Sequence, residues 1–183
     1  FPYSTFVGNS LIAVFSNVAS QRILRSSRLG GYYLYFYKGQ IMILIFRNAT
    51  QEDSDFLFDI RNDDLTRKNS HNSDLVSIDG HNQWLNSSLK NKNRMIFIAE
   101  ENGIKLGVGR IDRLKDEDEL SWTVSPDHRG KGFGVKIVEF LLKTATLKTR
   151  AEIKKHNIPS INIAKKAGMS VALETQDLYV FTM

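Results

Sequence analysis

The most informative part of the sequence is the stretch Val124-Ser-Pro-Asp-His-Arg129-Gly130-Lys131-Gly132-Phe133-Gly134. An alternating apolar pattern precedes this stretch, and Pro126 ends it, so we expect a strand that stops there. Apolar residues at helical spacing follow, from Ile137 to Ala145. Three alternate glycines let the backbone turn tightly and approach a ligand closely. Because the first N–H groups of a helix have no partner within it, the turn predicts an anion site for a phosphate or pyrophosphate.

The glycine pattern narrows the choice of ligand. The Walker A pattern is absent, and Val135 stands where the dinucleotide-binding fingerprint has its third glycine. What remains is Arg129-Gly-Lys-Gly-Phe-Gly134, after a strand end of the form Val-x-Pro. This pattern resembles motif A of the Gcn5-related N-acetyltransferase (GNAT) superfamily, which binds the pyrophosphate of acetyl-CoA. The alternative is a glycine-rich turn that holds no ligand.

A second segment, further along the chain, is also similar to this superfamily. Asn157 is followed by Ser160 and then by Gly168-Met169, in the order and spacing of the family's fifth strand and next helix. Met169 replaces the usual phenylalanine. The resemblance covers residues 42–183, and nothing in residues 1–41 matches the family.

Hydrophobic periodicity predicts the remaining elements independently. Thr50 is expected to cap a helix, Asn102-Gly103 to form a hairpin turn, and residues 62–78 to form a loop with at most one helical turn. Helices are expected at about 79–89, over about fifteen residues after Gly134, and from Pro159 to Gly168. Strands are expected at 42–46, 95–99, 104–108, 120–124, 151–155, 171–173 and 178–181. This order of elements predicts an α/β (α+β) fold with a mixed, mostly antiparallel sheet of about six or seven strands and helices on both faces, and the resemblance described above implies the GNAT fold.

The charge of the chain is concentrated at one end. Of 183 residues, 25 are Lys or Arg and 20 are Asp or Glu, giving a net charge of +5. Residues 1–41 hold four of the basic residues and no acid, which leaves the rest of the chain almost neutral. A nucleic-acid-binding surface is therefore not expected. The chain has no cysteine, which excludes a disulfide scaffold or a cysteine nucleophile and fits a cytoplasmic location.

Residues 1–41 differ from the rest of the chain. We interpret them as an N-terminal extension of unknown role, followed by a GNAT domain over residues 42–183. The segment from Arg22 to Arg28 is rich in Arg and Ser, like a transit peptide, and the apolar run Leu11–Ser20 is too short for stable membrane insertion. The aromatic run Tyr32–Tyr37 is either packing or a surface for a membrane or partner.

The resemblance implies the activity. An N-acetyltransferase would move the acetyl group of acetyl-CoA to a primary amine by direct attack in a ternary complex. The segment His81-Asn-Gln-Trp84-Leu is similar to bacterial enzymes that acetylate amino sugars of nucleotide-linked sugars, and this resemblance implies an amino sugar or another small molecule as the acceptor. A protein or peptide N-acetyltransferase, and a non-catalytic CoA-binding domain, are the alternatives. The family also allows a homodimer and needs no metal, and the four histidines are widely spaced.

The catalytic candidates follow from the same resemblance. Glu119 is the candidate general base, with His81 as the competing base; the structural alternatives are a solvated charged turn for Glu119 and a solvated helix position for His81. Ser160 matches a serine near the CoA sulfur. Ala164 stands where many relatives have a tyrosine acid. The candidate cofactor-binding residues are Val124 through its backbone N–H, Arg129, Gly130, Lys131, Gly132, Phe133, Gly134, Asn157 and Ser160.

Overall fold

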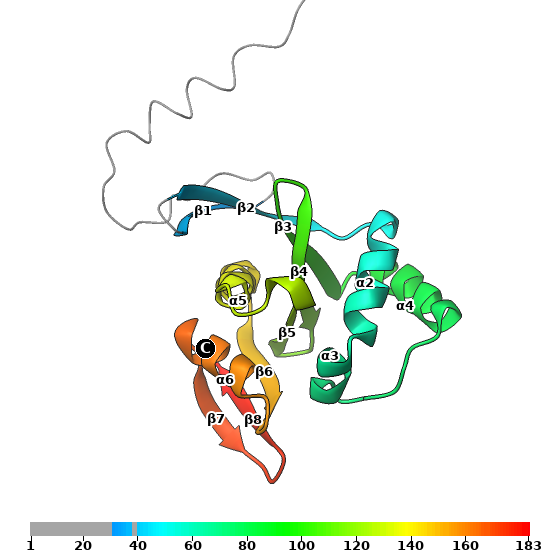
Figure 1. Cartoon of the computed structure of the whole chain (residues 1–183). Coiled ribbons are helices and arrows are strands. Elements are labelled where there is room, and N and C mark those ends of the chain that lie inside the picture. Colours follow the sequence, from blue (N-terminus) through cyan, green and yellow to red (C-terminus); the bar gives the residue numbers. More distant parts are fainter. Residues whose placement is uncertain (1–30, 38–39) are drawn as a thin grey trace, which may run out of the picture.

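The computed structural model describes residues 31–37 and 40–183. The interpretations of Leu11–Ser20 and Arg22–Arg28 lie outside these described residues. The described chain forms one eight-stranded sheet in the order β1-β2-β3-β4-β5-β6-β8-β7, in which only the β5–β6 pair is parallel (Figure 1). The strands are β1 Gly31–Tyr37, β2 Gln40–Asn48, β3 Arg94–Glu101, β4 Ile104–Arg113, β5 Glu117–Val124, β6 Lys148–Lys154, β7 Ser170–Glu174 and β8 Leu178–Thr182.

The helices mostly follow the predicted pattern. Thr50 is the N-cap of a short 3₁₀ helix, η1, that leads directly into α2. The helix after the glycine turn has twelve residues rather than about fifteen, because Ala145 leaves the helical conformation. α3 forms within the segment that we expected to be mainly loop. The helices are η1 Gln51–Asp53, α2 Ser54–Asn62, α3 Asp64–Asn69, α4 Ile78–Lys90, η2 Pro126–His128, α5 Phe133–Thr144 and α6 Ile158–Lys166.

The first strand comes from the segment that we interpreted as an extension. β1 pairs antiparallel with β2, with Gly31 opposite Phe46 and Tyr37 opposite Gln40. The sheet therefore has one strand more than the six or seven expected. The described part of residues 31–41 continues the sheet, while the limit of the domain at residue 42 stays a prediction.

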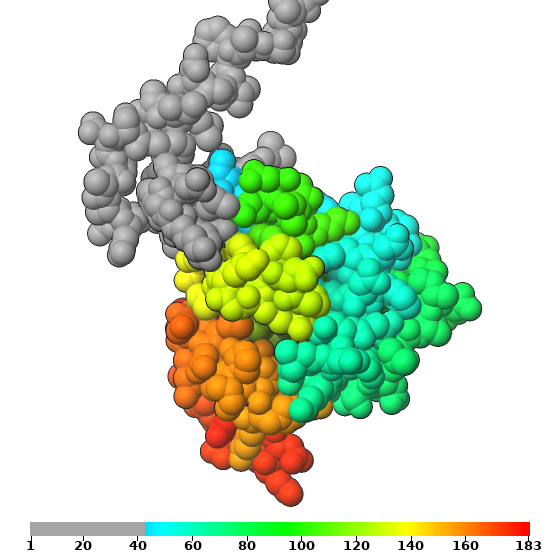
Figure 2. Space-filling model, in the orientation of Figure 1, coloured from blue at the N-terminus to red at the C-terminus, as the bar shows by residue number. Residues whose placement is uncertain are grey.

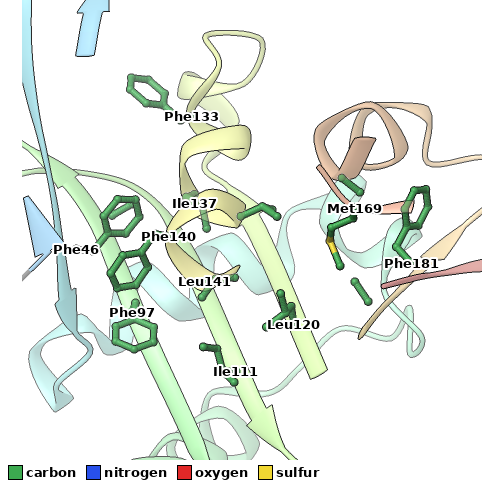
Figure 3. Packing of buried hydrophobic residues seen from close by; sticks show 14 of the residues in the cluster. Phe46, Phe97, Ile111, Leu120, Phe133, Ile137, Phe140, Leu141, Met169 and Phe181 are labelled. Carbon is green, nitrogen blue, oxygen red and sulfur yellow. The ribbon is translucent and has the colours of Figure 1, made fainter. Parts of the chain in front are cut away.

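Helices cover both faces of the sheet, as predicted. Successive residues of a strand point to opposite faces, so Phe97 packs in the larger core with α5 and α6, whereas Ile96 and Ile98 pack in a second core with α2 and α4. The rings of Phe46 and Phe140 stack 4.2 Å apart beside Phe97 (Figure 3). Burying each such side chain contributes about 1.5–3 kcal/mol, so both helical layers are held mainly by apolar contact.

A buried carboxylate joins the start of the helical layer to the sheet. Asp53 lies 2.7 Å from Arg47 Nη1 and 2.7 Å from Lys105 Nζ, and it accepts a hydrogen bond from the Thr50 N–H at 2.9 Å. Burial opposes ionisation of Asp53, but the hydrogen bonds from Arg47, Lys105 and Thr50 outweigh it and hold the pKa of Asp53 well below its usual value. Asp53 therefore connects β2, η1 and β4 through ion pairs and hydrogen bonds.

Candidate active site

The site begins where two parallel strands separate. β5 and β6 pair only from Glu117 opposite Lys148 to Glu119 opposite Arg150, although β5 continues to Val124 and β6 to Lys154. A cleft of about 990 Å³ opens at this gap and is lined by residues of both strands and of α2, α3, α5 and α6. Figure 2 shows a hollow between the yellow α5, the orange α6 and the cyan-green α2–α3 segment.

The glycine turn forms one wall of the cleft. Gly130 and Gly132 have φ angles of +75° and +89°, a region that favours glycine, and Gly132 is the N-cap of α5 without a capping side chain. Gly134 serves a different purpose, because a Cβ there would lie 2.5 Å from Cδ1 of Ile163. Gly134 thus lets α5 approach α6. The turn directs the start of α5 into the cleft, as an anion site requires.

The end of β5 presents backbone groups to the same gap. The Ser125 N–H donates to the Leu106 carbonyl at 2.9 Å, so Ser125 belongs to a hydrogen-bonded pair with β4. Such pairs alternate along an antiparallel ladder, so Val124, opposite Gly107, belongs to a non-hydrogen-bonded pair. The N–H of Val124 is therefore directed away from β4, toward the side on which β6 has separated. This is the position expected for a donor to a developing oxyanion.

The two basic residues of the turn do not present free charges to the cleft. Lys131 is outside the cleft lining, and its Nζ donates to the Asp127 carbonyl at 2.8 Å. Arg129 lines the cleft, but its guanidinium is paired with Asp63. The predicted backbone ligands Gly130, Gly132, Phe133 and Gly134 all line the cleft.

The start of α6 forms the opposite wall. The Asn157 side chain caps this helix by accepting a hydrogen bond from the Ser160 N–H at 3.2 Å, and both residues line the cleft. Ala164 is fully buried in the larger core. Among the described residues that line the cleft none is a tyrosine, so the acid found in many relatives has no replacement of the same kind here.

Glu119 lies at the end of the cleft that faces α2 and α4. It stands opposite Asp112 on β4, on the face of the sheet that also carries Val108 and Arg110. Its carboxylate forms no hydrogen bond or ion pair with the other described residues, in contrast to Asp112, which pairs with Arg94 and Arg110. Glu119 therefore has no hydrogen-bonded partner in the described chain, although Arg110 and Arg150 interact with it electrostatically, and its carboxylate can accept a proton from a bound amine.

His81 is also part of the cleft wall, but it is buried rather than solvated. Only 1% of its surface is exposed, and its ring lies 5.4 Å from Phe58 and 5.8 Å from Trp84. Burial lowers the pKa of His81, against the opposing effect of a backbone hydrogen bond with Ser54. Its Nε2 is buried without a hydrogen-bond partner among the described residues. A lowered pKa makes the imidazole a weaker proton acceptor, and its ring is almost closed off from solvent, so we prefer Glu119 over His81 as the base.

Two arginines in the cleft were not predicted. Arg61, at the end of α2, donates from Nη2 to the Asn72 carbonyl at 3.0 Å, while its Nη1 is buried without a partner in the described chain. Arg110 lies on β4, and its Nε is 2.7 Å from Oδ2 of Asp112. Burial lowers the pKa of both guanidinium groups. The only signal in the sequence was that each arginine interrupts an apolar pattern, next to Ile60 in one case and two residues after Val108 in the other.

Comparisons with known proteins agree with this geometry. Residues 44–170 match the family described as Acetyltransferase (GNAT) domain. The chain therefore belongs to the GNAT family of N-acetyltransferases, enzymes that take their acetyl group from acetyl-CoA. No curated protein matches the chain.

Solved structures show the same fold at low sequence identity. A spermidine N-acetyltransferase from Vibrio cholerae, in complex with CoA and spermine, has a TM-score of 0.70 and 15% identity over 76% of this chain and 94% of its own. An N-acetyltransferase from Staphylococcus aureus Mu50 has a TM-score of 0.65 and 23% identity over 76% and 97%. A GNAT-family acetyltransferase from Streptococcus pneumoniae has a TM-score of 0.60 and 16% identity over 76% and 98%.

Within residues 31–37 and 40–183, no group of three or more His, Asp or Glu side chains gathers where it could hold a metal ion. No helix in the described part of the chain is both long and apolar enough to cross a bilayer.

Proposed function

We propose that this protein transfers the acetyl group of acetyl-CoA to the primary amine of a small molecule that also carries an anionic group, such as an amino sugar linked to a nucleotide. The observation that carries the proposal is the pair of arginines, Arg61 and Arg110, that line the cleft together with Glu119.

The glycine turn and the gap between β5 and β6, at the end of the cleft away from Glu119, fit acetyl-CoA. This cosubstrate supplies a thioester that an amine can attack. The backbone of Gly130 to Gly134 and the first turn of α5 would hold its pyrophosphate, because this turn combines positive φ angles with an open helix start. Asn157 shapes the opposite wall. The gap between β5 and β6 would receive the pantetheine arm, since no strand pairing fills it beyond Glu119.

Three groups of this chain would take part in the reaction. Glu119 would accept the proton that the amine must lose to become a nucleophile. The Val124 N–H would donate a hydrogen bond to the carbonyl oxygen as negative charge develops on it. The hydroxyl of Ser160 would donate a proton to the departing sulfur or orient a water toward it, since Ala164 offers no acid.

The charged side chains that line the cleft near Glu119 favour an acceptor amine that carries an anionic group over a polyamine. A polyamine needs several carboxylates, but Glu152 is already paired with Arg150 and lies 3.3 Å from His71 Nε2. Arg61, by contrast, has a buried N–H group without a partner, which costs about 1–3 kcal/mol unless a ligand or water satisfies it. Spermidine, the substrate in the name of the Vibrio cholerae enzyme, is therefore the competing candidate rather than the preferred one.

An acceptor panel tests the proposal. Release of CoA thiol would be followed with a UDP-linked amino sugar, the free amino sugar, spermidine and a peptide with a free N-terminus. We expect the highest kcat/KM for the UDP-linked sugar. Arg61→Gln should raise KM for that acceptor about tenfold, because one hydrogen bond from a charged group is lost. The KM for the free amino sugar should stay almost unchanged.

A matched control separates a contact from general electrostatics. Lys68→Gln removes one positive charge from the exposed surface of α3, outside the cleft lining, and should leave all four acceptors unchanged. A higher kcat/KM for spermidine than for the UDP-linked sugar would contradict the anionic acceptor. Equal effects of Arg61→Gln and Lys68→Gln would contradict a direct contact by Arg61.

A further inference from the structure

The arginine of the glycine turn makes contacts that a phosphate ligand would not need. Arg129 follows η2 and donates from Nε to the Val124 carbonyl at 3.3 Å. Its Nη2 donates to the Asp63 carboxylate and, at 3.2 Å, to the Thr66 hydroxyl. One side chain thus joins the end of β5 to the beginning of α3, 66 residues earlier in the sequence.

Asp63, the partner of Arg129, lies at the junction between α2 and α3. These two helices form the wall of the cleft where the acceptor amine would bind, which we call the acceptor wall. Its backbone N–H caps α2 by donating to the Asp59 carbonyl at 3.0 Å, and its side chain caps α3 by accepting from the Thr66 N–H at 2.9 Å. Burial opposes ionisation, but the hydrogen bonds from Arg129 and Thr66 lower the pKa of Asp63, so the carboxylate stays charged at neutral pH.

The far end of α3 is tied to the other side of the cleft. Lys154, at the end of β6, donates from Nζ to the Lys68 carbonyl at 3.1 Å. α3 therefore spans the gap between the two separated strands, anchored to β5 through Arg129 and to β6 through Lys154. Leu65, Thr66 and Asn69 of this helix line the cleft.

We propose that Arg129 is a positioning residue that holds the acceptor wall against the end of β5, and that it does so through Asp63 rather than by binding phosphate. This inference rests on the proposed acetyl transfer, and it differs from the expectation, drawn from the sequence, that Arg129 is a cofactor-binding residue. The bond to the Val124 carbonyl also fixes the peptide next to the proposed oxyanion donor.

A double-mutant cycle tests the proposal with Arg129→Gln, Asp63→Asn and the two together. Asparagine keeps the oxygen that caps α3 but loses the charge that binds Arg129. We expect each single variant to raise the acceptor KM about tenfold and the double variant to do no worse, because one interaction is lost in all three. The dissociation constant of acetyl-CoA, measured by calorimetry, should change less than about threefold.

The matched control is Asp64→Asn, which removes the neighbouring charge. Its side chain is 94% exposed and pairs with Arg67, not with Arg129, so its acceptor KM should be unchanged. Arg129→Lys keeps the charge but cannot reach all the partners of a guanidinium, so it should restore only part of the wild-type KM. Thermal unfolding of every variant would identify any that lose the fold.

Two results would overturn the proposal. A tenfold loss of acetyl-CoA affinity in Arg129→Gln, with none in Asp63→Asn, would show that Arg129 binds the cofactor. Additive effects on acceptor KM would show that the two residues act separately.

The role of Arg129 can also be tested without measuring acetyl transfer, so that this test does not depend on the proposed function. Amide hydrogen exchange in residues 64–69 should speed up in both Arg129→Gln and Asp63→Asn, even if no acceptor is acetylated. Faster exchange in Asp63→Asn alone would mean that the cap, not Arg129, holds α3, and would also contradict the proposal.

Discussion

Replacing Gly132 by alanine adds a Cβ to a residue whose φ is +89°. Nothing in the described chain lies within 4 Å of that Cβ, so the cost is conformational rather than steric. An L-residue in the left-handed region costs about 1–2 kcal/mol. If the turn keeps its shape, this energy is lost from the free energy of unfolding. If the turn relaxes in the free protein, the same energy must be supplied when the pyrophosphate binds.

For Gly132→Ala, the structure therefore predicts the sum of two changes: the change in unfolding free energy and the change in acetyl-CoA binding free energy. The loss of unfolding free energy and the loss of acetyl-CoA binding free energy should together amount to about 1–2 kcal/mol, a factor of about 5–30 in the combined equilibrium constants. Urea unfolding gives the first quantity and calorimetric titration the second.

Gly103 provides the matched control. It has a φ of +77° and equally open surroundings, but it lies in the β3–β4 turn, outside the cleft lining. Gly103→Ala should lower the unfolding free energy by about the same 1–2 kcal/mol and leave acetyl-CoA affinity unchanged. A well-folded Gly132→Ala protein with neither quantity altered would refute the reasoning that this turn needs a positive φ at Gly132.

Two further predictions concern the framework of the site. Gly134→Ala should destabilise the fold by about 1–3 kcal/mol, and Ile163→Val in the same chain should restore part of the loss in a urea titration, because it removes the atom 2.5 Å from the new Cβ. Asp53→Asn should cost about 2–3 kcal/mol at pH 7. Since folding lowers the pKa of Asp53, its stabilisation begins to decrease as pH falls below the unfolded value of about 4 and is fully lost only below the much lower folded pKa, so the difference in unfolding free energy between wild type and variant should be smaller at pH 3 than at pH 7 but should not vanish.

The sequence predicted the elements whose signal is local. The alternation of Leu120, Trp122 and Val124 placed them on the face packed against α5, and Asn102-Gly103 forms the expected turn with φ angles of +49° and +77°. These features depend on neighbouring residues, so periodicity and turn chemistry were enough. The order of these elements correctly predicted the mixed sheet with helices on both faces, whereas the GNAT family was correctly predicted from the resemblance of two motifs to that family.

Long-range contacts were beyond such reasoning. α3 has a polar sequence of six residues, and Arg129 holds its start from 66 positions away, so the local pattern indicated a loop. The burial of His81 depends on Phe58, which packs against it from another helix. The arginines of the acceptor end carried only the weak signal of a charge within an apolar pattern. The roles assigned to Glu119 and Ser160 stay predictions, supported by their place in the cleft.

The pH–rate profile of Glu119→Gln, measured beside His81→Gln with one accepted amine, tests the central claim most directly. Glu119→Gln should keep acetyl-CoA affinity, lower kcat about 100-fold at neutral pH, and recover partly as pH rises, because more amine then arrives unprotonated. His81→Gln should lower stability and keep the shape of the profile, since the imidazole is buried. A wild-type profile in Glu119→Gln, together with loss of the acidic limb in His81→Gln, would contradict the account and make His81 the base.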